Sequence, residues 1–186
     1  MFNDEEIVAL TREYGGMFGL NHTNRLIKLT AMLGEGMDYN RDAIRIAAHI
    51  HDWGAYPKWM LPGVDHAVRS TEVAREYLKQ NDPGPALRDL VLECIEYHHG
   101  GPAERSLESK LFTDADALDL LGAIGFARVF SMVPRDIAGG FALLENFRAM
   151  SIAAITLDKS REIARTRLAE MDTMIAAFKE ESFGLL

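Results

Sequence analysis

An adjacent histidine and aspartate, His51-Asp52, stand at the end of an apolar pattern formed by Ile44, Ile46 and Ile50. Neighbouring residues of a helix point about 100° apart, so the two side chains can converge only on a point beyond the end of the helix. Imidazole and carboxylate groups are both good ligands for divalent transition metals. The doublet therefore predicts a metal ion at a helix end, provided that other parts of the chain supply more ligands.

Further residues with metal-ligand chemistry stand near the predicted ends of other helices. They are His22, His66, His98, His99, Asp116 and Asp119. Metal sites in helix bundles are commonly built in the core from side chains of facing helices. The pattern therefore predicts that helix ends from distant parts of the chain meet around bound metal.

The order of these residues resembles the HD-domain superfamily of metal-dependent phosphohydrolases. Its members carry a first histidine, a His-Asp doublet and a late aspartate, and members with two metals add two histidines before the late aspartate. The matching residues here are, in chain order, His22, His51-Asp52, His66, His98 and Asp116. The run from Thr113 to Gly122 is also similar to an ADxLDxxG motif of one branch. The resemblance covers roughly residues 15–133.

The resemblance implies a ligand set for two ions, in which Asp52 bridges them. The first ion would be held by His22, His51, Asp52 and Asp116, and the second by Asp52, His66 and His98. Mixed imidazole and carboxylate ligands favour Fe, Mn, Zn, Co or Ni over Mg or Ca. One or two divalent transition-metal ions are therefore the expected cofactors.

The implied activity is hydrolysis of a phosphate ester or anhydride in a small molecule, foremost a nucleotide. Two ions about 3.5–4 Å apart can turn a water molecule into a nucleophile and draw charge off a phosphoryl group. The residues expected to carry catalysis are Asp52, His66 and His98. The expected partner is therefore a small phosphorylated substrate.

Four further residues are candidates for contact with the substrate: Lys58, His99, Asp119 and Arg128. Asp119 could instead orient a ligand, and Arg128 could instead pair with an acid. Many relatives carry a lysine three residues after the aspartate of the doublet, but Ala55 occupies that position here. Lys58, the only cation of the loop at 54–65, is a candidate replacement, although a solvated lysine explains it as well.

Three alternatives remain at this point. In a single-metal phosphohydrolase, His66 and His98 would contact the substrate phosphate instead of a second ion. In a di-iron oxygenase of the same fold, two irons would activate oxygen. In a purely structural interpretation, the histidines and acids are scattered residues of a helical protein. The number of bound metals distinguishes the single-metal enzyme from the two-metal enzyme, and oxygen consumption distinguishes the oxygenase from a phosphohydrolase.

His49 and His51 cannot both bind the same metal ion from a regular helix. The two residues are two positions apart, so about 200° of helix separates their side chains. We expect His49 to be buried against a neighbour or to support a ligand.

Helical periodicity without strand alternation predicts an all-α, single-domain helical bundle of the HD type over residues 1–186, with the metal-site core at about 15–133 and a helical extension at about 134–186. Asn21, Asn40 and Asp65 are the predicted N-caps of helices that begin at the following residue. The expected helices cover about 4–13, 22–33, 41–53, 66–79, 86–97, 114–132, a segment around 141–147, and 158–181, with a connector at 104–112.

Composition limits the classes of partner. The net charge of −8 over 186 residues argues against a nucleic-acid polymer. No apolar run approaches the roughly 20 residues of a membrane-spanning helix, and the acidic N-terminus lacks the order of a secretory signal. The single cysteine, Cys94, is expected to be a small buried hydrophobe. A cytoplasmic protein is the expectation, and a homodimer is left open.

Overall fold

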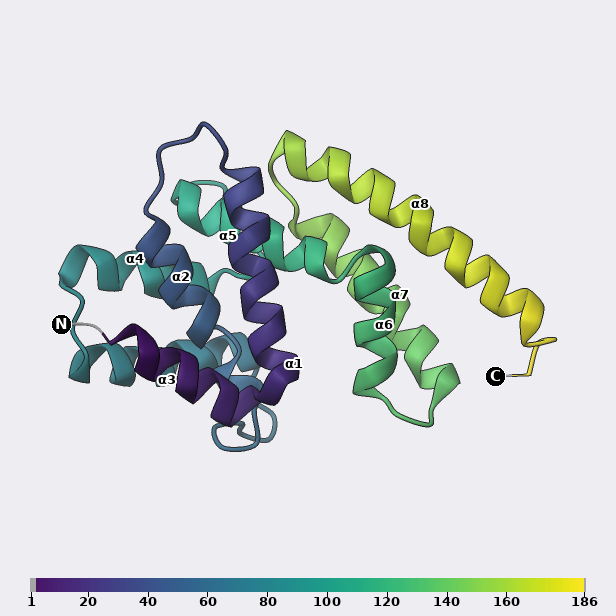
Figure 1. Ribbon diagram of the computed structural model, residues 1–186, viewed down its shortest axis with the longest axis horizontal. Helices are drawn as coiled ribbons and strands as arrows, with labels where there is room; N and C mark the ends of the chain where they lie inside the picture. The colour runs from purple at the N-terminus through teal and green to yellow at the C-terminus, as the bar shows by residue number, and fades with distance from the viewer. Residues whose placement is uncertain (1–2, 186) are drawn as a thin grey trace. The chain divides into compact units, whose positions relative to one another are not determined.

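A computed structural model describes residues 3–185 of the chain, and within them it contains eight α-helices, one 3₁₀ helix and no strand (Figure 1). The prediction of an all-α fold is confirmed. The elements are α1 Asp4–Leu33, α2 Arg41–Ile50, η1 Trp53–Ala55, α3 His66–Gln80, α4 Pro85–Glu96, α5 Leu107–Asp119, α6 Gly122–Met132, α7 Ile137–Ala154 and α8 Asp158–Glu181.

The chain divides into two compact units, Met1–Thr113 and Asp114–Leu186, and α5 runs through the division. The expectation of one domain with an extension from about residue 134 stays a prediction. Among residues 3–185, no helix combines the length and the apolar character that crossing a bilayer requires.

Helix α1 bends at Gly16, where the backbone (φ 60°, ψ −160°) leaves the helical region (Figure 1). A glycine adopts this conformation at little cost, because it has no Cβ. The prediction of a new helix capped by Asn21 is wrong, because the helix resumes directly after the bend and His22 lies in its interior. The ring of Tyr56 packs on the bend so closely that neither Gly15 nor Gly19 has room for a Cβ.

The predicted caps of the next two helices are confirmed. The side chain of Asn40 accepts a hydrogen bond from the Ala43 N–H, and that of Asp65 accepts from Ala67 and Val68. Helix α2 ends at Ile50, three residues earlier than expected, with His51 as its C-cap. The doublet therefore stands where the helix stops, as the argument for a convergent site requires.

The connector expected at residues 104–112 is wrong, because α5 begins at Leu107. Its first turns bury Leu111 and Phe112 completely, and this apolar contact outweighs the polar residues just before them. The single helix expected from residue 114 to 132 is also wrong. It breaks at Gly122, whose φ of +73° is incompatible with a continuing helix, and α6 begins there.

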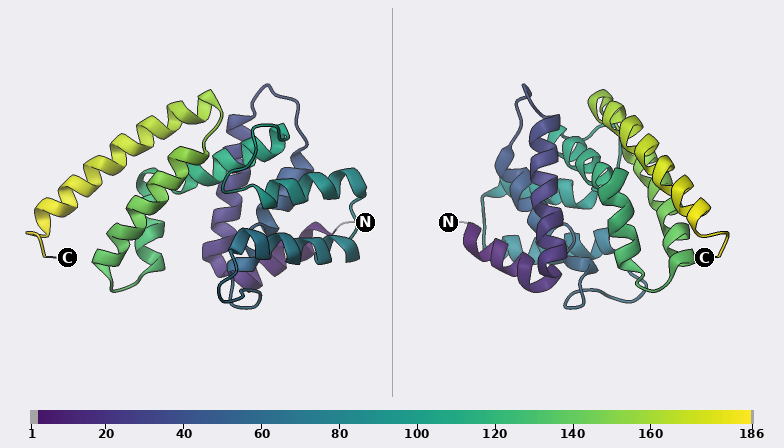
Figure 2. Two further views of the ribbon diagram at one scale, coloured as in Figure 1. Left: turned by 180° about the vertical axis from the view of Figure 1, so that it is seen from behind. Right: turned by 45° about the vertical axis from the view of Figure 1, so that its right-hand side comes forward.

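The second unit contains α6, α7 and α8 (Figure 2). A small apolar cluster lies between these helices. The fully or nearly buried members are Val129, Leu144, Met171 and Ile175. The segment just before α8 is tied to the middle of α5 by Asp114, which accepts hydrogen bonds from the backbone N–H groups of Thr156 and Leu157 at 2.8 Å each.

Candidate metal centre

Three ligand types converge in the first unit where α1 passes the end of α2. The Nε2 atoms of His22 and His51 face each other at 3.2 Å, and Asp52 Oδ2 lies 3.4 Å from His51 Nε2 and 3.7 Å from His22 Nε2. Both histidines are almost completely buried. Two imidazole lone pairs at this distance repel each other, so a shared proton or a cation must lie between them.

Backbone carbonyls fix which ring nitrogen of His51 faces this point. Its Nδ1 lies 3.0 Å from the carbonyl oxygen of Ala48. A carbonyl oxygen only accepts hydrogen bonds, so Nδ1 carries the hydrogen and Nε2 of the neutral ring carries a lone pair. Such an outer hydrogen bond is the usual way in which a protein orients a metal-binding histidine.

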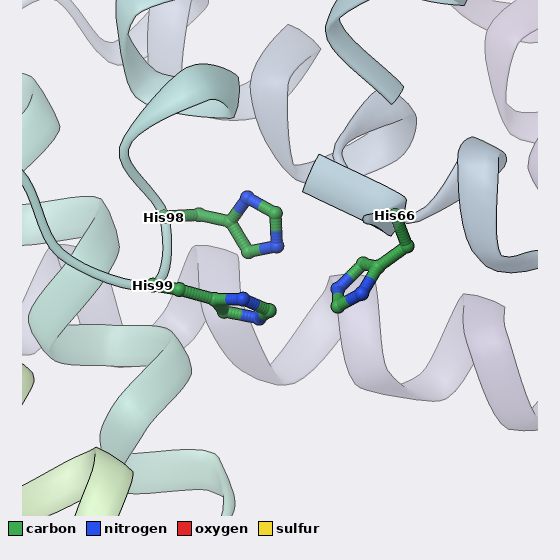
Figure 3. A group of neighbouring side chains, drawn as sticks. All are labelled: His66, His98 and His99. Carbon is green, nitrogen blue, oxygen red and sulfur yellow. The ribbon is translucent and has the colours of Figure 1, made fainter. Parts of the chain in front are cut away.

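A second cluster of histidines lies beside the first. His66 begins α3, and His98 and His99 follow the end of α4 (Figure 3). Their ring centroids are 4.0 Å apart for His98–His99, 4.5 Å for His66–His99 and 5.4 Å for His66–His98. The Nδ1 atom of His98 lies 2.6 Å from the carbonyl oxygen of Ile95, so His98 also directs its Nε2 atom away from its own helix.

The carboxylate of Asp52 links the two clusters. Its Oδ2 atom faces His22 and His51, whereas its Oδ1 atom lies 3.8 Å from His66 Nε2. A carboxylate with each oxygen toward a different imidazole group has the arrangement of a bridging ligand. The sequence-based expectation that Asp52 stands between two sets of ligands therefore agrees with this geometry.

The donor set fits a divalent transition metal. In each cluster the available ligand atoms of three residues lie within 4.8 Å of one another. Two ligand atoms bound at about 2.1 Å to one ion lie roughly 3.0–3.4 Å apart at angles of about 90–110°. The His22–His51 and His51–Asp52 distances fall in this range. Residues 3–185 therefore contain two groups that could hold a divalent metal.

The electrostatics of the first cluster keep Asp52 ionised. Burial by itself raises the pKa of a carboxyl group, but the neighbouring imidazole groups of His51, His22 and His98 outweigh burial and hold the pKa of Asp52 well below its usual value. The residue thus offers two anionic oxygen atoms at neutral pH.

His49 lies outside the cluster, as expected. It is buried, and its Nδ1 atom lies 3.1 Å from the hydroxyl oxygen of Thr11. Burial, reinforced by the positive charge of Arg45, lowers the pKa of His49 to about 4. A neutral imidazole packed in the core is therefore its state near pH 7.

Three predicted site residues lie in the second unit. Asp116 is buried on α5, and its role as the late carboxylate ligand stays a prediction. Asp119 and Arg128 were both expected to contact substrate. They form a buried ion pair, with Arg128 Nη1 2.6 Å from Asp119 Oδ2. Their pairing gives each a structural reason to be present, and a contact with substrate stays a prediction.

Lys58 points to neither histidine cluster. Its Nζ atom lies 3.4 Å from Glu13 Oε1 and 4.1 Å from the ring centroid of Tyr14. It lines a pocket whose walls include no predicted metal ligand. The expected phosphate contact of Lys58 at the metal centre stays a prediction.

Two threonines near the centre were not found from the sequence. The Thr23 hydroxyl donates to the carbonyl oxygen of Ala48, which also accepts from His51. The Thr11 hydroxyl lies 3.0 Å from the His49 carbonyl oxygen. Both tie α1 to the last turn of α2. The only sequence signal was that Thr23 directly follows His22, because buried threonine has no periodic signature of its own.

The sequence model of the HD domain family matches residues 19–121, a range that includes both histidine clusters and Asp116. The chain belongs to the HD domain family. No curated protein matches the sequence of this HD-domain protein.

Solved structures share the fold over almost the whole chain. A predicted HD superfamily hydrolase from an uncultured Thermotogales bacterium is 27% identical, with a TM-score of 0.64 over 95% of this chain and 91% of that one. YpgQ from Bacillus subtilis, solved in complex with ADP, is 23% identical (TM-score 0.69, 96% and 94%). An HD-superfamily hydrolase from Bacillus thuringiensis is 24% identical (TM-score 0.66, 96% and 95%). Membership of the HD domain family and similarity to a protein named as an HD superfamily hydrolase indicate that the chain is a hydrolase.

Proposed function

We propose that this HD-domain protein is a metal-dependent phosphohydrolase that cleaves a phosphate ester or anhydride of a small molecule. The observation that carries the proposal is the position of Asp52 between two imidazole clusters, one oxygen toward each. His22, His51 and Asp52 would hold one ion, with Asp116 as a proposed fourth ligand. Asp52, His66 and His98 would hold the second.

Bound divalent ions would lower the pKa of a water molecule and neutralise charge on a phosphoryl group. The chain contributes preorganisation. The carbonyl oxygens of Ala48 and Ile95 lock the rings of His51 and His98 with Nε2 facing inward. Because these rings are buried and already oriented, little reorganisation is needed when charge develops.

His99 is the side chain best placed to serve the substrate. Its ring lies against both His66 and His98, and it is less buried than His98. We propose that it contacts a phosphoryl oxygen, as the sequence-based assignment has it. A third imidazole ligand for the second ion is the competing role, because its ligand atom lies within 4.8 Å of those of His66 and His98.

Nucleotides are the substrates to test first. The small-molecule class follows from the net charge of −8, which disfavours a nucleic-acid polymer. A structurally similar protein, YpgQ of Bacillus subtilis, was solved with ADP. We therefore propose a nucleoside phosphate as substrate, with simple phosphomonoesters as the comparison set.

A phosphate-release screen tests the function. The purified chain, loaded in turn with Mn²⁺, Fe²⁺, Co²⁺, Ni²⁺ or Zn²⁺, is offered nucleoside mono-, di- and triphosphates and phosphomonoesters, with and without oxygen. We expect metal-dependent release of phosphate that is indifferent to oxygen and abolished by a chelator. Release that occurs only with iron and consumes oxygen would instead indicate the di-iron oxygenase. No release under any loading would contradict the proposal.

A further inference from the structure

A pocket of about 560 Å³ lies in the first unit apart from the histidine clusters. Its walls come from α1, α3 and the segment that follows Asp52, and none of the predicted metal ligands lines it. Small-molecule sites typically have volumes of about 300–1,000 Å³, apolar walls and a few polar groups. The size of this pocket is therefore that of a small-molecule site, and its lining indicates which molecule would fit.

Four aromatic side chains line the pocket: Tyr14, Trp53, Trp59 and Tyr77. The Tyr14 ring stands nearly perpendicular to Trp53, at 5.1 Å and 83°, and to Trp59, at 6.0 Å and 81°. Trp53 meets Tyr77 edge-on at 5.1 Å. Trp53 is almost completely buried, so the rings that present surface to a ligand are the half-buried Tyr14, Trp59 and Tyr77. Ring faces and edges are the surfaces that a flat aromatic ring packs against.

One polar atom among these rings selects for a hydrogen-bond acceptor. The Nε1 atom of Trp59 is buried and has no hydrogen-bond partner among the described residues. An indole N–H is a donor only. A buried donor without a partner costs free energy, which a ligand recovers only if the Trp59 ring turns its N–H toward an acceptor atom of that ligand.

Two cations stand at the Trp59 end of the pocket. Lys58 Nζ lies 4.1 Å from the centroid of Tyr14 and 5.4 Å from that of Trp59, and Arg69 Nε donates to the Trp59 carbonyl oxygen at 2.8 Å. Hydrogen bonding to Tyr14 raises the pKa of Lys58. An ammonium group has three donors, and the Lys58 side chain is 47% exposed, so an anion can reach it beside its contact with Glu13.

Acidic residues limit the charge of the ligand. Glu6, Glu72 and Glu76 also line the pocket, and Arg69 Nη1 already pairs with Glu72 at 2.8 Å. Like charges oppose a ligand with several negative groups. Arg75 is the third cation of the lining, so three cations and three glutamates balance, and a single anionic group near Lys58 is compatible with this lining.

We propose that this pocket binds a flat aromatic molecule with one anionic group, its ring against Tyr14, Trp59 and Tyr77 and its anion at Lys58. The site is separate from the proposed phosphohydrolase centre. The same chemistry is offered by a nucleoside monophosphate and by an aromatic carboxylate, which differ in the anion and in the size of the ring system.

Tryptophan fluorescence of the full chain tests the proposal directly, because both tryptophans of the chain line the pocket. The protein is kept in a chelator, so metal-dependent hydrolysis does not interfere. AMP and benzoate are the two anionic probes, and adenosine and ribose 5-phosphate each lack one of the two features. We expect saturable binding of AMP or benzoate. If AMP binds, the affinities of adenosine and ribose 5-phosphate should be at least about tenfold lower than that of AMP. If benzoate alone binds, neither adenosine nor ribose 5-phosphate should bind detectably.

Variants assign the binding to this pocket. Lys58→Gln should lower the affinity for the anionic probe about tenfold, because a charged hydrogen bond is lost, and should leave any binding of adenosine unchanged. Trp59→Phe should lower the affinity for the anionic probe a few-fold, because the ring is kept and the N–H is lost. Lys79→Gln, an exposed change on α3 outside the lining, should bind like the wild type.

Three results would overturn the proposal. One is the absence of saturable binding by both anionic probes. Another is equal affinity for AMP and for either adenosine or ribose 5-phosphate, which would show that the pocket does not recognise both the ring and the anion. The third is an unchanged affinity in Lys58→Gln. Since every titration is made without metal, failure here leaves the phosphohydrolase proposal untouched, and the reverse also holds.

Discussion

The first unit buries imidazole groups against one another, whereas the second unit buries carboxylates against donors of its own chain. His22 and His51 direct Nε2 atoms at each other at 3.2 Å. In contrast, Asp114 accepts from two backbone N–H groups, and Asp119 accepts from Arg128. Burial of a polar residue therefore does not by itself mark a ligand. The marker is a set of acceptors that face each other and need a proton or a cation between them.

The largest expected effect is at Asp52, the aspartate of the first unit that lies between imidazole groups. Asp52→Asn removes the charge and one ligand oxygen of the proposed bridge, so phosphate release should fall about a thousandfold, or roughly 4 kcal/mol of transition-state stabilisation. Steady-state kinetics on the metal-loaded variant measure this. The control is Asp42→Asn, an exposed change on α2. Retention of more than a tenth of the activity by Asp52→Asn would contradict the role of the bridge.

The buried ion pair of the second unit should govern stability. Arg128→Met leaves the Asp119 carboxylate buried without this cation, so the free energy of unfolding should fall by about 3–4 kcal/mol. Urea denaturation measures the loss. The double variant Asp119→Leu/Arg128→Met should regain most of it, because no lone charge remains. If the single variant loses less than about 1 kcal/mol, the pair is not the structural element described here.

His49 should make stability depend on pH. The folded-state pKa of about 4 lies below the usual 6.5, so the unfolded chain binds the proton more tightly. The stabilisation is complete above pH 6.5 and is lost as the pH falls from there to 4, by about 2–3 kcal/mol. In chelator, the stability advantage of wild type over His49→Asn should shrink by that amount between pH 7 and 4. A constant difference across this range would refute the assignment.

The smallest effect concerns the support of His51. Thr23→Val removes one of the two hydrogen bonds to the Ala48 carbonyl oxygen, so metal affinity should fall about tenfold. Competition with a coloured chelator measures it. Thr30→Val is the matched control, because this buried hydroxyl on the same helix has no hydrogen-bond partner among the described residues. Equal metal affinities of the two variants would show that Thr23 does not support metal binding through His51.

The candidate metal centre was predictable where a local pattern ends at a residue with metal-ligand chemistry. The doublet was found because the apolar pattern stops at His51, and His66 because Asp65 caps the following helix. His22 was expected at the start of a helix but lies inside α1, and its role as a metal ligand stays a prediction. The glycines suggested a helix start, but a bend at Gly16 lets α1 continue.

The ion pair of the second unit could not be predicted, because it spans a break in the helix. Asp119 and Arg128 are nine residues apart and would point in different directions on one continuous helix. The positive φ of Gly122 starts a new helix and brings them together. The sequence shows that a glycine is present, but only the backbone shows that this one redirects the chain.

The metal content of the purified chain tests the central claim most directly. Elemental analysis after loading with each transition ion should find two ions per wild-type chain. In His66→Ala one position should be empty while the other stays filled, because His22, His51 and Asp52 are untouched. A folded protein that retains no transition ion under any loading condition would contradict the account, and so would a His66→Ala variant that still holds two.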